Sequence, residues 1–252
     1  MSASATGDRS GTSDATRRAT RDIVLLMGAV GAGKGTQAKI LEARLGMPHL
    51  ASGDLFREAI RDGSVLGERA RAFMERGDLV PDDVTTELII ERLARTDTLH
   101  GAILDGFPRT VTQAEALDAT LAQRGERVTR VLYFDVPTDE LVRRTAGRLV
   151  CPVDGSLYHV QTNPPRVAGR CDIDGVELVE RDDDRPDVVR ARLEKQIPPM
   201  LEVVDYYERQ GVVTRIDGRR PIEEVTETLL SALGASGGRV GLPADVGGTN
   251  AW

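Results

Sequence analysis

The segment GAVGAGKGTQ, residues 28–37, follows a short apolar run, IVLL, at residues 23–26. An apolar strand, then the spacing G-x-x-x-x-G-K, then a helix is the arrangement of a phosphate-binding loop, whose glycines let backbone N–H groups converge on phosphate oxygens. The usual pattern places Ser or Thr directly after the lysine, where its hydroxyl binds Mg²⁺. Here Gly35 follows Lys34, and Thr36 comes one residue late. The segment therefore predicts a nucleotide site in which the metal keeps more of its own water molecules.

Composition narrows the class of protein. The chain has 252 residues, of which 40% are hydrophobic and 29% charged, as in ordinary globular proteins. A net charge of -7 argues against general nucleic-acid binding. No apolar run approaches the ~20 residues of a membrane span, and the N-terminus shows no apolar signal-peptide core. We therefore expect a cytoplasmic protein that binds neither nucleic acid nor membrane.

Three later apolar runs repeat the pattern of residues 23–26, and each ends in an aspartate. The runs are 102–104, 131–134 and 212–216, and the aspartates are Asp105, Asp135 and Asp217. Helical patterns between the runs, one of them capped by Gly46, predict an α/β fold with a parallel sheet and helices on both faces. Ligands of such sheets bind at the carboxyl ends of the strands. Asp105 is therefore the candidate to hold the waters of Mg²⁺, with Asp54 as a second candidate.

Two segments interrupt the alternation of strands and helices. Residues 51–80 have a polar, helical pattern, which predicts a helical flap. Residues 147–184 contain turn signals in place of helical periodicity, which predicts a small β-rich lid of three or four short strands. Residues 1–21 and 235–252 have few large apolar side chains, so we expect two disordered ends. The folded part is then 22–234, with a core of 22–50, 81–146 and 185–234.

Several motifs together resemble the adenylate kinases, in the order in which that family carries them. GAVGAGKGTQ resembles the family's opening loop, and DGFPRT at 105–110 with Gln113 resembles its most specific signature. The other matching motifs are SGDLFR at 52–57, GDLVP at 77–81, Gly147-Arg148, Tyr158-His159, NPP at 163–165, RDDD at 181–184 and Asp217-Gly218. The resemblance covers roughly residues 22–234 and points to the bacterial type with a long lid.

The resemblance implies a monomeric enzyme that catalyses Mg·ATP + AMP ⇌ 2 ADP. Residues 51–80 would bind the acceptor nucleotide AMP, and residues 147–184 would close over the donor. Phosphoryl transfer requires two phosphates in line, neutralised charge and exclusion of water, and it needs little covalent help from the protein. Attack by an already ionised AMP phosphate needs no separate general base.

The resemblance also assigns residues to these roles. The catalytic cations are Lys34, Arg109, Arg148, Arg181 and Arg192. The ATP-binding residues are Gly31, Ala32, Gly33, Lys34, Gly35, Thr36, Arg144, Arg148, Leu157, Tyr158 and Arg220. The AMP-binding residues are Ser52, Arg57, Asp78, Leu79, Val80, Gly106, Phe107, Pro108, Arg109, Gln113, Arg181 and Arg192.

Two other functions are compatible with a phosphate-binding loop. The first is a nucleoside monophosphate kinase for another acceptor base, but the Gln113 amide and the long lid favour AMP. GTP is not excluded as a donor, because recognition of the donor base by backbone groups does not depend on particular side chains and is hard to detect in a sequence. The second is a P-loop switch protein. The chain lacks the guanine-reading pattern Asn-Lys-x-Asp, and six arginines in matched positions are more than a switch requires.

The lid carries two cysteines in matching contexts, Cys151-x₂-Asp154 and Cys171-x₂-Asp174. In many adenylate kinases of Gram-positive bacteria these four positions bind a structural Zn²⁺, and in others they form hydrogen bonds. Zinc accepts thiolate and carboxylate ligands. With only two thiols, we favour a hydrogen-bonded cluster without metal, and structural zinc is the alternative. A disulfide is not expected in a reducing cytosol.

Overall fold

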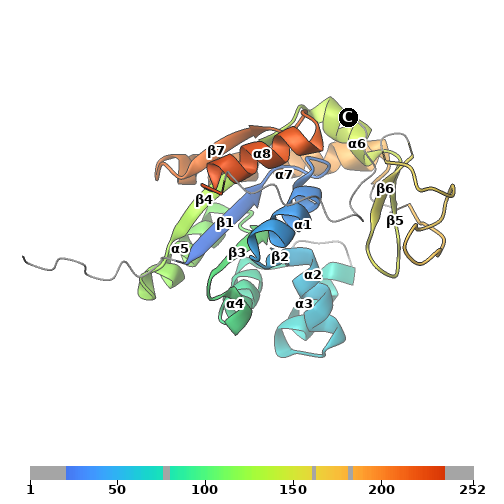
Figure 1. Cartoon of the computed structure of the whole chain (residues 1–252). Helices are drawn as coiled ribbons and strands as arrows, with labels where there is room; N and C mark the ends of the chain where they lie inside the picture. Colours follow the sequence, from blue (N-terminus) through green and yellow to red (C-terminus); the bar gives the residue numbers. More distant parts are fainter. Residues whose placement is uncertain (1–20, 76–79, 161–162, 181–183, 236–252) are drawn as a thin grey trace, which may run out of the picture.

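The computed structural model describes residues 21–75, 80–160, 163–180 and 184–235 (Figure 1). The two predicted disordered ends therefore lie almost entirely outside the described residues. Arg21 and Ala235 are the exceptions. The prediction assigned Arg21 to the N-terminal extension, but the structure packs it into the fold. Its side chain is only 8% exposed, and its Nη2 atom donates to Leu93 O at 2.7 Å and to Thr98 Oγ1 at 2.6 Å.

A parallel sheet of five strands forms the centre of the molecule, with the order β2-β3-β1-β4-β7. The strands are β1 (Asp22–Met27), β2 (His49–Ala51), β3 (Gly101–Asp105), β4 (Val128–Asp135) and β7 (Val213–Asp217). This confirms the α/β class and the four predicted strands. Strand β2 was not predicted, because three residues are too few to show a strand periodicity.

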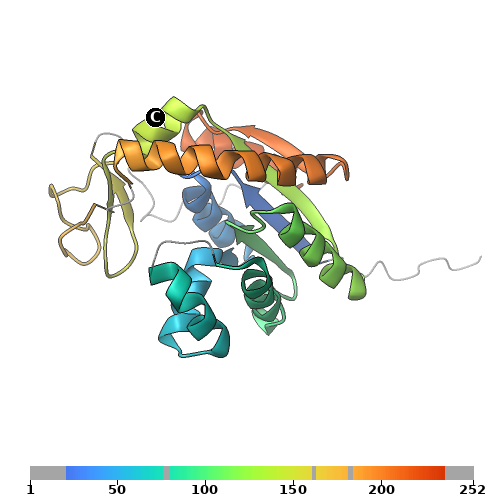
Figure 2. The same ribbon diagram turned by 180° about the vertical axis from the view of Figure 1, so that it is seen from behind.

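Helices cover both faces of the sheet, as predicted. They are α1 (Lys34–Leu45), α4 (Asp82–Leu93), α5 (Val111–Gln123), α6 (Thr138–Thr145), α7 (Pro186–Glu208) and α8 (Ile222–Ala232), with a 3₁₀ turn at Thr96–Thr98. Helices α1 and α8 lie over one face (Figure 1), and α5 and α7 lie over the other (Figure 2). Across the described ranges, no helix is both long enough and apolar enough to span a membrane.

The core consists of two apolar clusters, one on each side of the sheet. Alternate residues of β1 divide between them: Ile23 and Leu25 point into one cluster, and Val24 and Leu26 into the other. This division is the expected consequence of a strand buried on both faces. It explains why β1 appears in the sequence as an uninterrupted apolar run. The loop that follows β1 therefore begins at the carboxyl end of a firmly packed central strand.

The flap and the lid are separate projections from this body (Figure 1). The described part of the flap consists of α2 (Ser52–Arg61) and α3 (Val65–Glu75), as its helical pattern predicted. The lid contains an antiparallel pair, β5 (Arg148–Val150) and β6 (Leu157–His159). Its described residues add three isolated bridges in place of the further strands that the sequence predicted. The turns in this part of the lid follow one another too closely for longer strands to pair.

Candidate functional site

The predicted phosphate loop joins β1 to α1. Gly31 has a φ of 83°, which favours glycine, and a Cβ there would lie only 2.7 Å from Thr145 Oγ1. The loop therefore packs directly against α6. Lys34 is half-buried, and its Nζ atom donates to Gly28 O at 2.8 Å and to Ala29 O at 3.0 Å. The ammonium group thus lies against the loop. Lys34 is the first residue of α1, so the ammonium group and the helix N-terminus both belong to the phosphate loop.

Four cations predicted from distant motifs lie within electrostatic reach of one another. Burial lowers the pKa of Lys34, the nearby Asp105 opposes this, and the positive charges of Arg109, Arg148 and Arg192 lower it further. The pKa of Arg109 is also lowered, first by restricted access to water and then by Arg192. These side chains come from α1, the loop after β3, β5 and α7. Four separate elements therefore each contribute one positive charge to the same site.

Asp105 ends β3 beside this cluster, as predicted. Its Oδ2 atom lies 3.3 Å from Nε2 of His49, which is on β2. Burial alone would raise the pKa of Asp105, but the hydrogen bond with His49 and the charges of Lys34 and Arg109 hold it below the usual value. Asp105 is therefore a carboxylate, the form that suits the waters around Mg²⁺. Asp54, the second candidate, is exposed and forms an ion pair with Arg57.

The predicted acceptor residues gather around the turn after β3. Ser52 Oγ donates to Gly106 O at 3.0 Å, and Arg109 Nε donates to the same carbonyl at 2.8 Å. Phe107 and Pro108 are buried and Val80 is half-buried. Arg57 points to solvent and is held by Asp54, so the structure does not bring it to Arg109. Asp78 and Leu79 lie outside the described residues.

Gln113 belongs to a hydrogen-bond network that sequence reasoning missed. The side chain is 3% exposed, its Oε1 accepts from the backbone N–H of Arg109 at 2.7 Å, and its Nε2 donates to Asp82 Oδ1 at 2.7 Å. Asp82 Oδ2 accepts from Thr110 Oγ1, also at 2.7 Å. Asp82 lies 31 residues from Gln113, so no local spacing in the sequence could reveal this contact.

Some of the predicted donor residues line a shallow hollow beside the phosphate loop. Its lining is Ala32, Gly33, Thr36, Gln37, Phe134, Arg144, Gly218, Arg220, Ile222 and Val225. Arg144 Nη1 donates to Gly218 O at 2.7 Å and Arg144 Nε to Glu140 Oε1 at 2.7 Å, so this guanidinium is fixed on the wall. Arg220 is exposed at the rim. Five of the predicted ATP-binding residues thus meet here.

The lid residues have different surroundings. Arg148 makes a two-point ion pair with Asp184, which is 6% exposed, and this pair joins the two ends of the lid. Tyr158 is buried inside the lid, where its hydroxyl accepts from Asp172 N at 2.8 Å. Its side chain therefore does not face the donor hollow, whereas Leu157 is 38% exposed. Arg192 lies on α7, and Arg181 lies outside the described residues.

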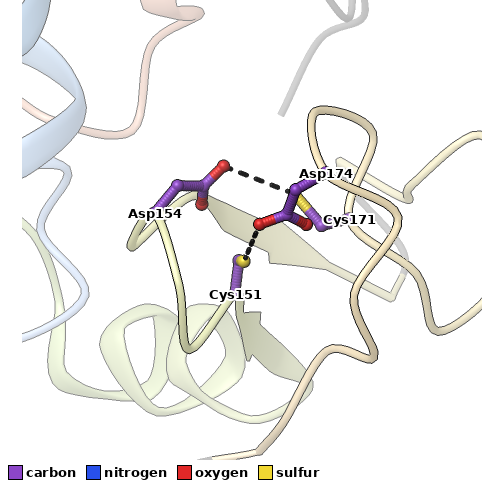
Figure 3. Close-up of side chains that lie close together, drawn as sticks. All are labelled: Cys151, Asp154, Cys171 and Asp174. Carbon is purple, nitrogen blue, oxygen red and sulfur yellow. Dashed lines mark hydrogen bonds between the residues drawn. The ribbon is translucent and has the colours of Figure 1, made fainter.

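The two cysteines and two aspartates of the lid meet in one cluster (Figure 3). Cys151 Sγ donates to Asp174 Oδ2 at 3.3 Å, and Cys171 Sγ donates to Asp154 Oδ2 at 3.5 Å. One candidate ligand atom from each residue lies within 4.8 Å of the others. Burial raises the pKa of Cys151 to about 11, so the thiol is neutral at pH 7. The donor types and spacing nevertheless fit a tetrahedral zinc site.

The comparisons with known proteins agree on one family. The family model described as "Adenylate kinase" matches residues 26–212. A protein named adenylate kinase from Exiguobacterium sibiricum is 46% identical over 211 residues, covering 84% of this chain and 98% of its own length. Namesakes from Oceanobacillus iheyensis and Agathobacter rectalis are 45% and 41% identical, covering 83% and 84% of this chain and 98% and 99% of their own lengths.

Proposed function

The chain belongs to the adenylate kinase family, and from that premise we propose that it transfers the γ-phosphoryl group of Mg·ATP in line to AMP. Membership of this family supports the overall activity, which is phosphoryl transfer between nucleotides in which ATP and AMP give two ADP.

The cluster of cations around Lys34 is the observation that carries the proposal. Burial is the main cause of the lowered pKa of Lys34, and the positive charges of Arg109, Arg148 and Arg192 lower it further, although Asp105 partly compensates. Such an arrangement is unfavourable unless a polyanion binds among the charges. Two nucleotides that meet through their phosphates supply that polyanion, and their in-line reaction needs little besides position and charge.

Each group then has a physical task. The loop N–H groups and Lys34 bind the donor β- and γ-phosphates, and Arg109 binds the AMP phosphate with Arg57 after the flap moves. Arg148 and Arg192, together with Arg181 by resemblance, neutralise charge on the transferring group. Asp105 would hold the hydrated Mg²⁺ of the donor, which would neutralise phosphate charge. An ionised oxygen of AMP is the nucleophile, so no protein base removes a proton.

We propose that lid closure excludes water from the donor phosphates, because water would otherwise compete with AMP as the acceptor. We also propose that the chain acts on free nucleotides as a monomer in the cytoplasm. The groups assigned to both nucleotides come from one chain, and the net charge of -7 does not favour polyanionic surfaces as partners.

A coupled assay that measures ADP production tests the acceptor and the donor. ATP should phosphorylate AMP much faster than GMP, CMP or UMP, and GTP should be compared as the donor with AMP as the acceptor. The Arg109→Ala variant should raise KM for AMP and lower kcat while leaving KM for ATP nearly unchanged. Arg124→Ala, at an exposed arginine just after α5, is the matched control. Faster use of another acceptor than of AMP would contradict the proposal.

For the lid we propose that the crossed thiol–carboxylate hydrogen bonds hold the cluster without a metal. The two crossed hydrogen bonds support this reading, because each thiol already has a carboxylate acceptor within the cluster. Metal analysis of protein purified without chelator is the test, and we expect much less than one equivalent of zinc. Zinc near one equivalent that is lost in Cys151→Ser would overturn the proposal and establish the four side chains as ligands.

A further inference from the structure

The side-chain amide of Gln113 has a fixed orientation in this structure. Asp82 Oδ1 accepts from Nε2 at 2.7 Å, and the backbone N–H of Arg109 donates to Oε1 at 2.7 Å. A carboxylate only accepts hydrogen bonds and a backbone N–H only donates them, so the nitrogen and oxygen of the amide cannot exchange places. The second carboxylate oxygen of Asp82 accepts from Thr110 Oγ1, which holds the carboxylate itself in position.

The amide keeps one N–H and one oxygen lone pair for a ligand. Adenine presents an acceptor at N1 beside a donor at its 6-amino group. Hypoxanthine and guanine present the reverse, an acceptor at O6 beside a donor at N1. An amide that could rotate by 180° would pair with both kinds of base. An amide held in one orientation pairs well with only one of them at a given position of the base.

We propose that Asp82 is a specificity-determining residue, which selects 6-amino over 6-oxo purines by fixing the orientation of the Gln113 amide. This inference rests on the proposed function, in which Gln113 contacts the acceptor base. Asp82 lies in the first turn of α4, and Gln113 lies in the first turn of α5. Selectivity is therefore a property of the contact between two helices and does not belong to the base-reading side chain alone.

The test compares kcat/KM for AMP with kcat/KM for IMP, which has the same ribose and phosphate but a 6-oxo base. In Asp82→Asn the new amide can donate or accept, so residue 82 no longer favours one orientation of Gln113, and only the backbone N–H of Arg109 still opposes its rotation. We expect the AMP:IMP ratio to fall about tenfold or more, since one misplaced hydrogen bond to a buried group is enough for that change. KM for ATP should stay nearly unchanged.

Asp83→Asn is the matched control. Asp83 shares the first turn of α4, so its loss has the same effect on the helix dipole, but its carboxylate is exposed and pairs with Arg69 at 2.7 Å. Its AMP:IMP ratio should equal that of the unaltered protein. A purely structural loss at Asp82 would reduce the use of AMP and IMP alike and preserve the ratio. Asp82→Ser, whose hydroxyl also both donates and accepts, gives a second variant if Asp82→Asn does not fold.

The outcomes separate the inference from the proposed function. If the unaltered protein does not prefer AMP to IMP, then the acceptor assignment fails and the inference fails with it. If the unaltered protein prefers AMP, but folded Asp82→Asn and Asp82→Ser keep its ratio within twofold, only the inference is overturned. A fall in the ratio in both variants, with none in Asp83→Asn, supports it.

Discussion

Lys34 shows how a single residue prepares the phosphate site. Its ammonium donates to two carbonyls of its own loop, at Gly28 and Ala29. Phosphate oxygens are stronger acceptors than these carbonyls because they are charged. Binding therefore requires only an exchange of partners within the loop, and the lysine does not have to be brought in from solvent.

Replacing Lys34 with alanine should lower kcat by about 10²–10³-fold, as expected for the loss of one preorganised charge in the transition state. The fold should persist, because Lys34 packs against its own loop and is not part of either apolar cluster. Lys39→Ala is the control, since Lys39 is an exposed lysine on the same helix. Steady-state kinetics and circular dichroism check both statements. A kcat within twofold of the unaltered value would contradict the role of Lys34.

The pH dependence of donor use follows from the same lysine. Its pKa in the free protein lies below the usual 10.5, mainly through burial. The ammonium form, which binds phosphate, is therefore lost at a lower pH than in an ordinary lysine. The profile of kcat/KM for ATP, which reports the free enzyme, should fall on the alkaline side at a pH below 10.5. Bound phosphates favour the charged form, so the corresponding fall in kcat should occur at higher pH.

Motifs predicted candidate site residues but not the side chains that hold them in place. Lys34, Asp105 and Arg109 were identified because a fixed local spacing accompanies their chemistry. His49 and Asp82 were missed, although they contact Asp105 and Gln113 directly. These contacts join residues 56 and 31 positions apart, and only the packing of β2 against β3 and of α4 against α5 brings them together. Partners of this kind leave no local pattern in a single sequence.

At the scale of elements, the flap depends on a close crossing of α2 and α3. A Cβ atom at Gly67 in α3 would lie 2.1 Å from the carbonyl oxygen of Ala59 in α2. The backbones of the two helices are therefore in close contact at Gly67. Gly67→Ala must push them apart, at a cost of about 1–3 kcal/mol in the free energy of unfolding. Because Ser52 and Arg57 lie on α2, KM for AMP should rise with the displacement.

Chemical denaturation and AMP kinetics together test this crossing. Gly53→Ala is the stability control, because a Cβ there meets nothing closer than 3.5 Å and adds a better helix former to α2. A Gly67→Ala protein as stable as the unaltered chain would show that the crossing tolerates a side chain.

The predictability of each element depended on its length and regularity. The helical flap and four strands were predicted because each shows several residues of one period. Strand β2 has three residues, and the lid pairs its strands over three positions each, so neither shows a periodicity of its own. Their places are fixed by contacts with β3 and by the cysteine cluster, which the sequence alone does not supply.

At the scale of the whole molecule, the fold brings charges to one place while keeping the lid structurally independent. Among the described residues, the two clusters of the sheet contain none from the lid, and the lid has its own small cluster of Cys151, Tyr158, Cys171 and Leu178. The lid can therefore move as a unit without exposing the main core, as closure over the donor requires. The ion pair between Arg148 and Asp184 joins the two ends of the lid.

This independence predicts the result of removing the lid. Val150 and Val179 exchange two backbone hydrogen bonds of 2.9 Å, so residues 151–178 can be replaced by an Asn-Gly turn across this pair. The shortened protein should keep a cooperative thermal transition, because both main clusters and Arg148 remain. Transfer to AMP should fall by roughly 10²-fold or more as the donor loses its positioning. ATP hydrolysis should increase relative to transfer as water enters.

Val153→Ser, at an exposed tip of the intact lid, is the control and should change neither rate. Loss of the thermal transition would show that the core depends on the lid, and an unchanged transfer rate would show that closure does not serve the reaction.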